Sequence, residues 1–377
     1  SGTTAAIHSS GAQVIDASTY AGFGAASSGD IVTAPGMWSL DNFGNKLIAT
    51  IFSGETFTWS SDATDATSTR AVLASGAPTA SRDMLVSTPD RHLVFFGTET
   101  TIGTKSSQDQ MFIRFSSQED ITDYTPTATN SAGTQRLADG SRIMGALRGR
   151  NAIYVWTDTA LFLMRFVGAP FTFAFEQVGT NCGLIGKNAA VEVDGTVYWM
   201  SENGFFRYGG QLESLPCLVE DFVFDDLNTV TKQHVNAGLN NLFGEINWFY
   251  VSSGSNTVNR VVTYNYFDSS NERPIWTTGT LDRTAWSDSA IFGKPHATQY
   301  DTSTNGSSSS STYVQGNTDG VSIYYEHETG LNQVKEGTET AIVANIESGD
   351  FDISITKEGG ASTKGDGEYM MKISRVI

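Results

Sequence analysis

Residues 140–210 read GSRIMGALRGRNAIYVWTDTALFLMRFVGAPFTFAFEQVGTNCGLIGKNAAVEVDGTVYWMSENGFFRYGG and contain one pattern twice. In the first copy an apolar strand, 153–156, meets a short polar turn, and a second strand, 161–166, runs to a glycine. The second copy repeats this order with strands 196–200 and 205–208. A strand, a tight polar turn, a strand and a glycine predict a β-meander, and two successive copies predict a repeated sheet unit.

The composition favours strands throughout the chain. Among 377 residues there are 38 glycines and only 8 prolines, and Thr, Ser, Val, Phe and Tyr are abundant. Aromatic and β-branched side chains fill pleated surfaces, and glycine supplies the positive φ that short turns need. We therefore expect an all-β protein with very little helix.

Six strand-turn-strand units can be followed along the chain. The last unit pairs 311–315 with 321–325, and 307–312 forms a loop tip of small residues. The returning strands end in aromatic residues at Trp59, Phe115, Phe166, Tyr208, Tyr266 and Tyr325. Their spacing of roughly 50 residues matches the blade length of a β-propeller. This favours a propeller of about six blades over the alternative, two stacked β-sandwiches.

The predicted propeller covers residues 36–330. Residues 1–35 lack sustained periodicity and read as an N-terminal arm or linker, whereas 331–377 form a C-terminal β segment that opens a further domain or closes the ring. Both ends of the chain look like cuts in a longer gene product. The one good helix candidate is 216–228, which has a proline near its start and links two blades.

Charge restricts the binding partners. With 23 basic and 41 acidic residues, the formal net charge is -18, which disfavours nucleic-acid binding by phosphate neutralisation and attachment to an anionic membrane. An acidic wall could instead repel a passing polyanion, although solubility alone explains the same charge. Cys182 and Cys217 are too few for a disulfide framework and are expected to be free and buried.

No catalytic, cofactor or metal motif is recognisable. The five histidines are scattered, and nucleophile-elbow, Walker and dinucleotide motifs are absent. Two groups remain as candidate interaction residues, with structural ion pairs or subunit contacts favoured over phosphate or cation binding. They are Arg142, Arg148 and Arg150, and the acidic pair Asp225 and Asp226.

The aromatic run 247–250 has two interpretations. It could form a sugar-binding platform, as in propeller lectins, but at strand spacing the commoner role of such residues is blade core. A glycan-cleaving enzyme is a third class, which would need two carboxylates about 5 to 10 Å apart in a cleft.

Several short segments together resemble one protein family. It comprises tail hub or nozzle proteins of short-tailed bacteriophages, also described as packaged-DNA stabilisation proteins. The resemblance runs from about Trp38 to Asp350 and lies in residues 38–44, 116–120, 123–126, 133–143, 155–161, 179–181, 216–217, 224–228, 264–266 and 283–286.

The resemblance implies a propeller in a ring-shaped tail assembly of the virion, with no catalytic residues. We expect a non-enzymatic protein that forms a ring with its own copies, in the expected number of six, around the channel through which DNA leaves. Other tail or portal-adaptor subunits would be its neighbours, and DNA would pass the lumen without specific binding. The alternative is a receptor-binding, glycan-binding or fibre-anchoring propeller module of the virion.

Overall fold

The computed structural model describes residues 37–62, 70–88, 90–271, 273–288, 291–301, 321–328, 330, 332–335 and 338–342. The chain divides into two compact units, Ser1–His327 and Glu328–Ile377. The arm predicted at 1–35, the small-residue loop tip at 307–312 and residues 343–377 of the predicted C-terminal β segment lie outside the described residues.

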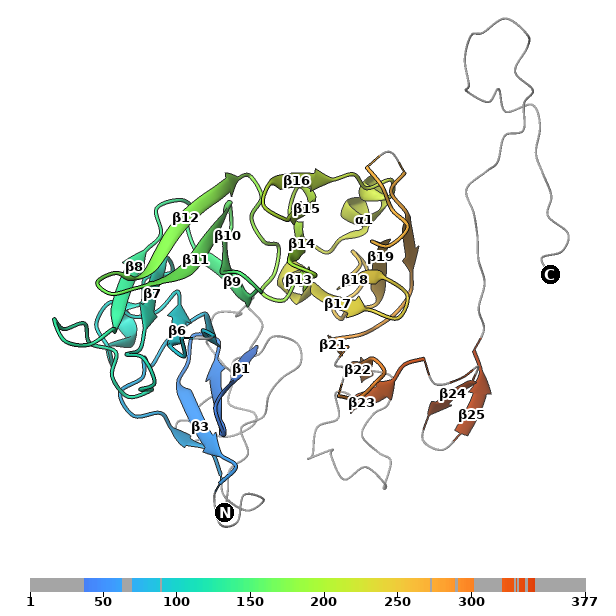
Figure 1. Ribbon diagram of the computed structural model, residues 1–377. Helices are drawn as coiled ribbons and strands as arrows, with labels where there is room; N and C mark the ends of the chain where they lie inside the picture. Colours follow the sequence, from blue (N-terminus) through green and yellow to red (C-terminus); the bar gives the residue numbers. More distant parts are fainter. Residues whose placement is uncertain are drawn as a thin grey trace, which may run out of the picture. The chain divides into compact units, whose positions relative to one another are not determined.

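The first unit is a six-blade β-propeller, mostly β, as the sequence predicted (Figure 1). Each blade is an antiparallel meander in chain order; five have four strands and the sixth has three in the described part. Blade 1 consists of β1 (Trp38–Phe43), β2 (Lys46–Ile51), β3 (Thr56–Ser60) and β4 (Val72–Leu73). Blade 2 consists of β5 (Asp83–Val86), β6 (Leu93–Phe96), β7 (Phe112–Phe115) and β8 (Gly133–Arg136). Blade 3 consists of β9 (Ile143–Arg148), β10 (Ile153–Thr157), β11 (Ala160–Gly168) and β12 (Thr172–Thr180). Blade 4 consists of β13 (Ala190–Val193), β14 (Thr196–Ser201), β15 (Gly204–Tyr208) and β16 (Leu212–Leu215). Blade 5 consists of β17 (Asn236–Asn240), β18 (Glu245–Tyr250), β19 (Arg260–Asn265) and β20 (Trp276–Gly279). Blade 6 consists of β21 (Ala285–Ser287), β22 (His296–Asp301) and β23 (Val321–Glu326).

The predicted strand pairs are the middle strands of the blades. In blade 3 the all-buried β10 pairs with β11, and Trp156 lies opposite Leu161 across the turn. The aromatic residues that set the repeat all fall on the third strand of a blade or directly after it. The stacked-sandwich alternative is therefore wrong.

The pairing predicted for the sixth unit, 311–315 with 321–325, stays a prediction, and β22 is an additional strand of this blade. Residues 311–315 lie outside the described part, and β23 pairs with β22, so that Ala297 lies opposite Tyr325. The strand β22 was missed because its sequence, HATQYD, lacks apolar alternation.

The helix predicted between blades 4 and 5 is present as α1 (Glu220–Asp226), shorter than expected and with only Val223 buried. The other helical turns in the described residues are η1 (Lys105–Ser107) and η2 (Lys232–His234). In the second unit, β24 (Asn332–Lys335) pairs antiparallel with β25 (Thr338–Ala341).

The core lies between the faces of neighbouring blades. The largest fully buried side chains include Trp156, Trp199 and Trp248, one each from blades 3, 4 and 5. The indole N–H of Trp199 donates to the carbonyl of Cys182 at 2.8 Å, and that of Trp248 donates to the carbonyl of Ala189 at 3.0 Å. Both acceptors precede blade 4, so these bonds tie blades to the connection between blades 3 and 4 as well as filling space. The run at 247–250 is blade core, as the commoner of its two interpretations predicted.

Candidate functional site

A buried ion pair joins the innermost strand of blade 2 to the segment that leads to blade 4. Lys187 Nζ lies 3.1 Å from Asp83 Oδ1, and the two side chains are 7% and 6% exposed. Asp83 also accepts hydrogen bonds from Ser39 Oγ at 2.8 Å and from the backbone N–H of Ala146 at 2.9 Å. Because Lys187 also donates to Ser39, the cluster connects blades 1, 2 and 3 with the segment that leads to blade 4. We call Lys187, Asp83 and Ser39 the axial cluster.

A second ion pair lies beside the axial cluster. Arg148 donates to Asp41 Oδ2 at 2.7 Å and to the carbonyl of Val86 at 2.8 Å. Asp41 also accepts the N–H of Val86 at 2.8 Å. Asp41, Arg148 and the axial cluster line a hollow of about 380 Å³. Each of the four charged side chains in it has a partner of opposite charge.

The other two candidate arginines lie beyond opposite ends of β9 and do not converge with Arg148. The backbone N–H of Arg142 faces the Asp158 carboxylate at 3.5 Å, and its buried Nε has no hydrogen-bond partner in the described part of the chain. The backbone N–H of Arg150 donates to Glu192 at 3.2 Å. The three arginines therefore form no common patch.

The acidic pair lies at the end of α1. Asp225 is exposed, whereas Asp226 is half-buried and lies 3.4 Å from Arg260 Nε. The backbone carbonyl of Asp226 accepts the N–H of Ser253 at 2.5 Å. These contacts fix the end of the helix against blade 5.

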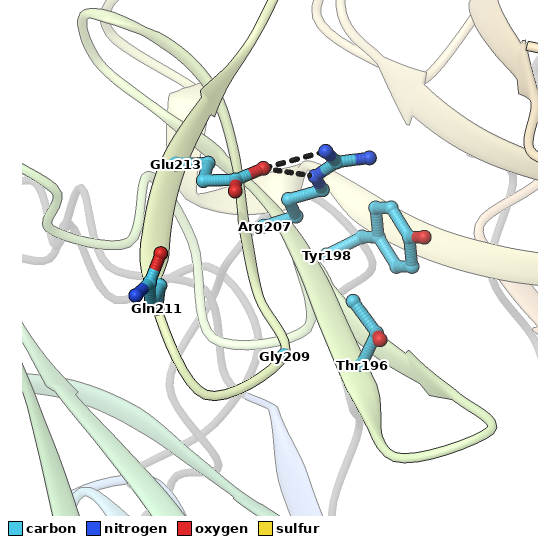
Figure 2. A pocket seen from close by; sticks show the side chains of 6 residues that line it. All are labelled: Thr196, Tyr198, Arg207, Gly209, Gln211 and Glu213. Carbon is cyan, nitrogen blue, oxygen red and sulfur yellow. Dashed lines mark hydrogen bonds and ion pairs between the residues drawn. The ribbon is translucent and has the colours of Figure 1, made fainter. Parts of the chain in front are cut away.

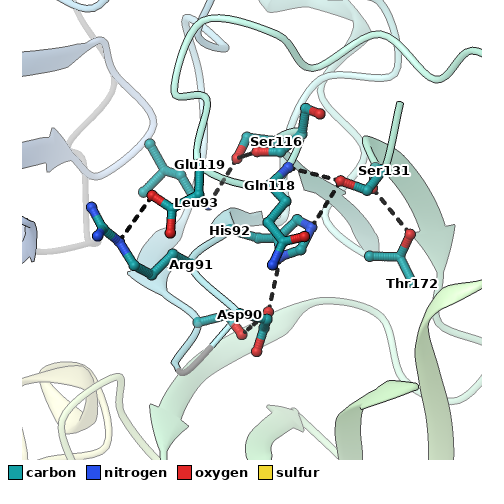
Figure 3. A network of polar contacts seen from close by, with 11 residues as sticks. Asp90, Arg91, His92, Leu93, Ser116, Gln118, Glu119, Ser131 and Thr172 are labelled. Carbon is teal, nitrogen blue, oxygen red and sulfur yellow. Dashed lines mark hydrogen bonds and ion pairs between the residues drawn. The ribbon is translucent and has the colours of Figure 1, made fainter. Parts of the chain in front are cut away.

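An Asp-His-Ser network lies between blades 2 and 3 (Figure 3). The fully buried His92 contacts Asp90 at 2.9 Å through Nδ1 and Ser131 Oγ at 3.2 Å through Nε2. Burial disfavours ionisation of Asp90, but hydrogen bonds from His92 and Ser87 outweigh it and hold the Asp90 pKa below its ordinary value.

The surroundings of His92 favour a structural role for this network. The imidazole packs edge-on against Phe173 at a centroid distance of 5.2 Å, and Ser131 Oγ accepts the Gln118 N–H at 2.7 Å. Thr172 on β12 donates to the carbonyl of Ser131 at 3.1 Å, which ties blade 3 to blade 2.

A polar hollow of about 310 Å³ lies on the outer part of blade 4, and we call it the Tyr198 pocket (Figure 2). It is lined by Thr196, Tyr198, Arg207, Gly209, Gln211 and Glu213. The Nε and Nη2 atoms of Arg207 donate to Glu213 Oε2 at 2.8 and 2.5 Å, and Nη2 also donates to Asn271 Oδ1 at 2.9 Å. The guanidinium is thereby held at the boundary between blades 4 and 5.

The pocket lining is electrically neutral near pH 7. Burial opposes the charge of Arg207, but hydrogen bonding and the charge of Glu213 outweigh it and raise the Arg207 pKa above its ordinary value. Burial, together with neighbouring Tyr264, raises the pKa of Tyr198, which stays protonated. One positive and one negative side chain therefore remain, paired with each other.

The described residues contain no group of three or more His, Cys, Asp or Glu side chains placed to hold a metal ion. Within the same part of the chain, no helix is long and apolar enough to cross a membrane. The two cysteines are free, as expected; Cys182 is buried, but Cys217 is only half-buried, which corrects the expectation for that residue. Burial raises the Cys182 pKa to about 11 and the Cys217 pKa to about 12, so neither is a thiolate near pH 7.

Sequence reasoning missed both the axial cluster and the Tyr198 pocket. The pocket could have been found, because the predicted turn between 196–200 and 205–208 places Tyr198 opposite Arg207. The axial cluster had no such signal, since Lys187 and Ser39 are 148 residues apart.

Comparisons with known proteins show no relative in sequence and only a weak likeness to solved structures. No protein-family model and no curated protein matches the chain. Among solved structures, it resembles the AfRom2 CNH domain (12% identity, 67% of this chain and 74% of that chain covered, TM-score 0.40). It also resembles Sqt1 of Saccharomyces cerevisiae (9% identity, 70% and 80% covered, TM-score 0.40).

A further match is the dihydro-heme d1 dehydrogenase NirN (10% identity, 70% of this chain and 51% of that chain covered, TM-score 0.42), of which this chain spans about half. None of the three is a phage tail protein. At this similarity, no activity, ligand or partner passes from these proteins to this chain. The order and pairing of its own strands show that the chain is a six-blade β-propeller.

Proposed function

We propose that this chain is a non-enzymatic structural component of a bacteriophage tail, a nozzle or hub, which forms an oligomeric ring around the DNA exit channel. In that place it helps to retain packaged DNA and to pass it outward. The resemblance to tail hub and nozzle proteins supports the proposal, because that family implies a propeller and the chain folds as one.

The observation that carries ring assembly is the exposure of large apolar side chains at two separate loop sites. The first is the tip of the β11–β12 hairpin, where Val167 near the end of β11 is 54% exposed and Phe171 just before β12 is 77% exposed. This hairpin overhangs its sheet, since β10 pairs with β11 only as far as Met164. The second site is on blade 5, where Leu242 is 68% and Phe267 64% exposed. We interpret each pair of exposed apolar side chains as a contact site, because apolar groups that cluster on a surface mark protein contacts.

Two different patches favour a head-to-tail contact between copies. A symmetric dimer joins one patch to itself, whereas a ring joins one patch to another patch on the next subunit. We therefore place the blade 3 hairpin tip against the blade 5 patch of the neighbouring copy. The acidic excess of the chain, -18, would face the lumen and prevent DNA from adhering.

Mass photometry of the full chain over a concentration series tests the assembly. We expect a closed oligomer, visible as rings in negative-stain images, that dissociates in the variant Phe171→Asp. The control is Val72→Asp, because Val72 is 62% exposed on β4, away from both patches, and this variant should assemble normally. A chain that stays monomeric at every concentration, or rings unaffected by Phe171→Asp, would refute the proposed interface.

The second candidate, a glycan-binding module, is favoured by one observation, the polar Tyr198 pocket.

A further inference from the structure

The Tyr198 pocket has a regular origin in the sheet of blade 4. Tyr198 on β14 lies opposite Arg207 on β15, and Arg207 lies opposite Glu213 on β16. Side chains directly opposite each other on neighbouring antiparallel strands share a face. An aromatic ring, a cation and an anion therefore stand in one row across three strands.

Gly209 lines the hollow beside this row and adds no side chain to it. Thr196 and Gln211 stand on either side of Gly209, and a Cβ on that glycine would lie 2.9 Å from Thr196 Oγ1. The volume of the hollow, about 310 Å³, is at the small end of the range of about 300 to 1,000 Å³ typical of ligand pockets.

Blade 5 holds one wall of the site in place. Tyr264 packs against Tyr198 with ring centroids 6.1 Å apart, and Asn271 accepts a hydrogen bond from Arg207. Figure 2 shows both contacts from Arg207 to Glu213 converging on one carboxylate oxygen. The second oxygen, Oε1, has no hydrogen-bond partner among the residues that the structure describes and can accept one. A fixed acceptor thus lies beside the remaining guanidinium donors.

The chemistry of the lining selects a class of ligand. Neighbouring hydroxyl groups of a sugar can donate to Glu213 and accept from Arg207, Gln211 or Thr196. The apolar face of a sugar ring packs against an aromatic side chain such as Tyr198. Since the ion pair is internally neutral and the chain carries -18, an anionic ligand gains nothing from the site and is repelled by the protein. We propose that the Tyr198 pocket binds a neutral saccharide.

This site goes beyond the proposed tail function and does not depend on it. A monomeric chain could bind sugar, and a ring could assemble without it. The two proposals are tested by separate measurements.

Binding is tested with the full chain, using saturation-transfer NMR and calorimetry. The probes are the neutral disaccharides lactose, maltose and cellobiose, with sialyllactose as the acidic counterpart, followed by a glycan array of neutral and acidic oligosaccharides. We expect at least one neutral saccharide to bind and sialyllactose to gain no affinity from its carboxylate.

Three variants place that binding in the pocket. Arg207→Met and Tyr198→Ala each remove a contact and should weaken binding about tenfold or more, the cost of a charge-assisted hydrogen bond or an aromatic contact. Gly209→Val removes no polar group, but its side chain would crowd Thr196 and take up space in the hollow, so it should weaken binding. The matched control is Arg165→Met on blade 3, because Arg165 forms a similar exposed pair with Glu176 at 2.8 Å and should not affect binding.

Absence of binding to every neutral probe would overturn the proposal. So would equal binding by the pocket variants and the Arg165→Met control, or a preference for acidic saccharides. Thermal unfolding of each variant shows whether a loss of binding reflects a loss of fold.

Discussion

The axial cluster and the Tyr198 pocket use the same chemistry in opposite ways. In the axial cluster, Lys187 and Asp83 are almost completely buried, and both oxygens of the carboxylate have partners. In the pocket, Arg207 and Glu213 are 27% and 43% exposed, and one carboxylate oxygen is unused. A buried pair with every group satisfied holds blades together, whereas a partly exposed pair with spare hydrogen-bonding capacity is available to a ligand.

The largest effect is expected from breaking the buried pair of the axial cluster. Lys187→Met leaves the Asp83 carboxylate buried without its cation, and we expect the free energy of unfolding to fall by about 3 to 5 kcal/mol. Urea unfolding measures this loss. The control is Lys232→Met, which removes a more exposed pair with Glu202 and should cost at most about 1 kcal/mol. Equal losses in the two variants would show that burial does not distinguish these pairs.

The Asp90-His92 pair extends the comparison to a second buried site. His92→Leu removes the imidazole from a carboxylate that is only 3% exposed and leaves it the hydrogen bond from Ser87; the loss of a hydrogen bond to a buried charge costs about 2 to 3 kcal/mol. Ser131→Ala leaves that pair intact and should cost about 1 kcal/mol. If the serine variant lost more stability than the histidine variant, the network would be centred on Ser131 instead.

His327 is half-buried, and its lowered pKa makes the stability of the protein depend on pH. Burial and the positive charge of Arg283 lower the His327 pKa from 6.5 to about 4. Between these values the unfolded chain binds a proton that the folded chain does not, so stability falls as pH drops from about 6.5 to about 4. After allowance for solvent screening, the loss is about 1 kcal/mol. Urea unfolding at several pH values should show this slope in the wild type and a reduced slope in His327→Gln.

The smallest effect on stability is expected at the Tyr198 pocket. Arg207→Met removes a partly exposed pair, and we expect a change of less than about 1 kcal/mol in the free energy of unfolding. Thermal unfolding measures it. A loss as large as that of Lys187→Met would mean that Arg207 supports the fold of blade 4, and the contrast between the two regions would fail.

The middle strands of blades 3 and 4 were predictable because each pair is joined by a tight turn and begins with a mostly apolar strand. The strand β10, IYVWT, is buried at every position, and such runs are visible in the sequence. The outer strands were not predictable, because β8 (GTQR) is an exposed edge without apolar alternation. The innermost strand β1 (WSLDNF) was not predictable from its apolar pattern either, because polar residues that reach neighbouring blades interrupt that pattern.

The two regions also differ in how far sequence alone could locate them. In a hairpin, the position of the turn fixes which residues of the two strands lie opposite each other. The pairing of Tyr198 with Arg207 can therefore be read from the nearby sequence. The meeting of Lys187 with Ser39 depends on the closure of several blades, which no local pattern encodes. The ion pair of Arg148 could not be predicted for the same reason. The sequence marked Arg148 as a contact residue, but its partner Asp41 lies far away in the chain, on the first strand of the propeller.

The reach of Lys187 to the first strand decides where the chain can be cut. Separate halves divided after blade 3 would leave Asp83 and Ser39 on one piece and Lys187 on the other, so neither piece retains the ion pair of the axial cluster. New termini are better tolerated at an exposed turn within one blade, such as Asp194-Gly195 between β13 and β14. A circular permutant opened there keeps every link around the axis, which makes this turn the natural place to insert a label or a fusion partner.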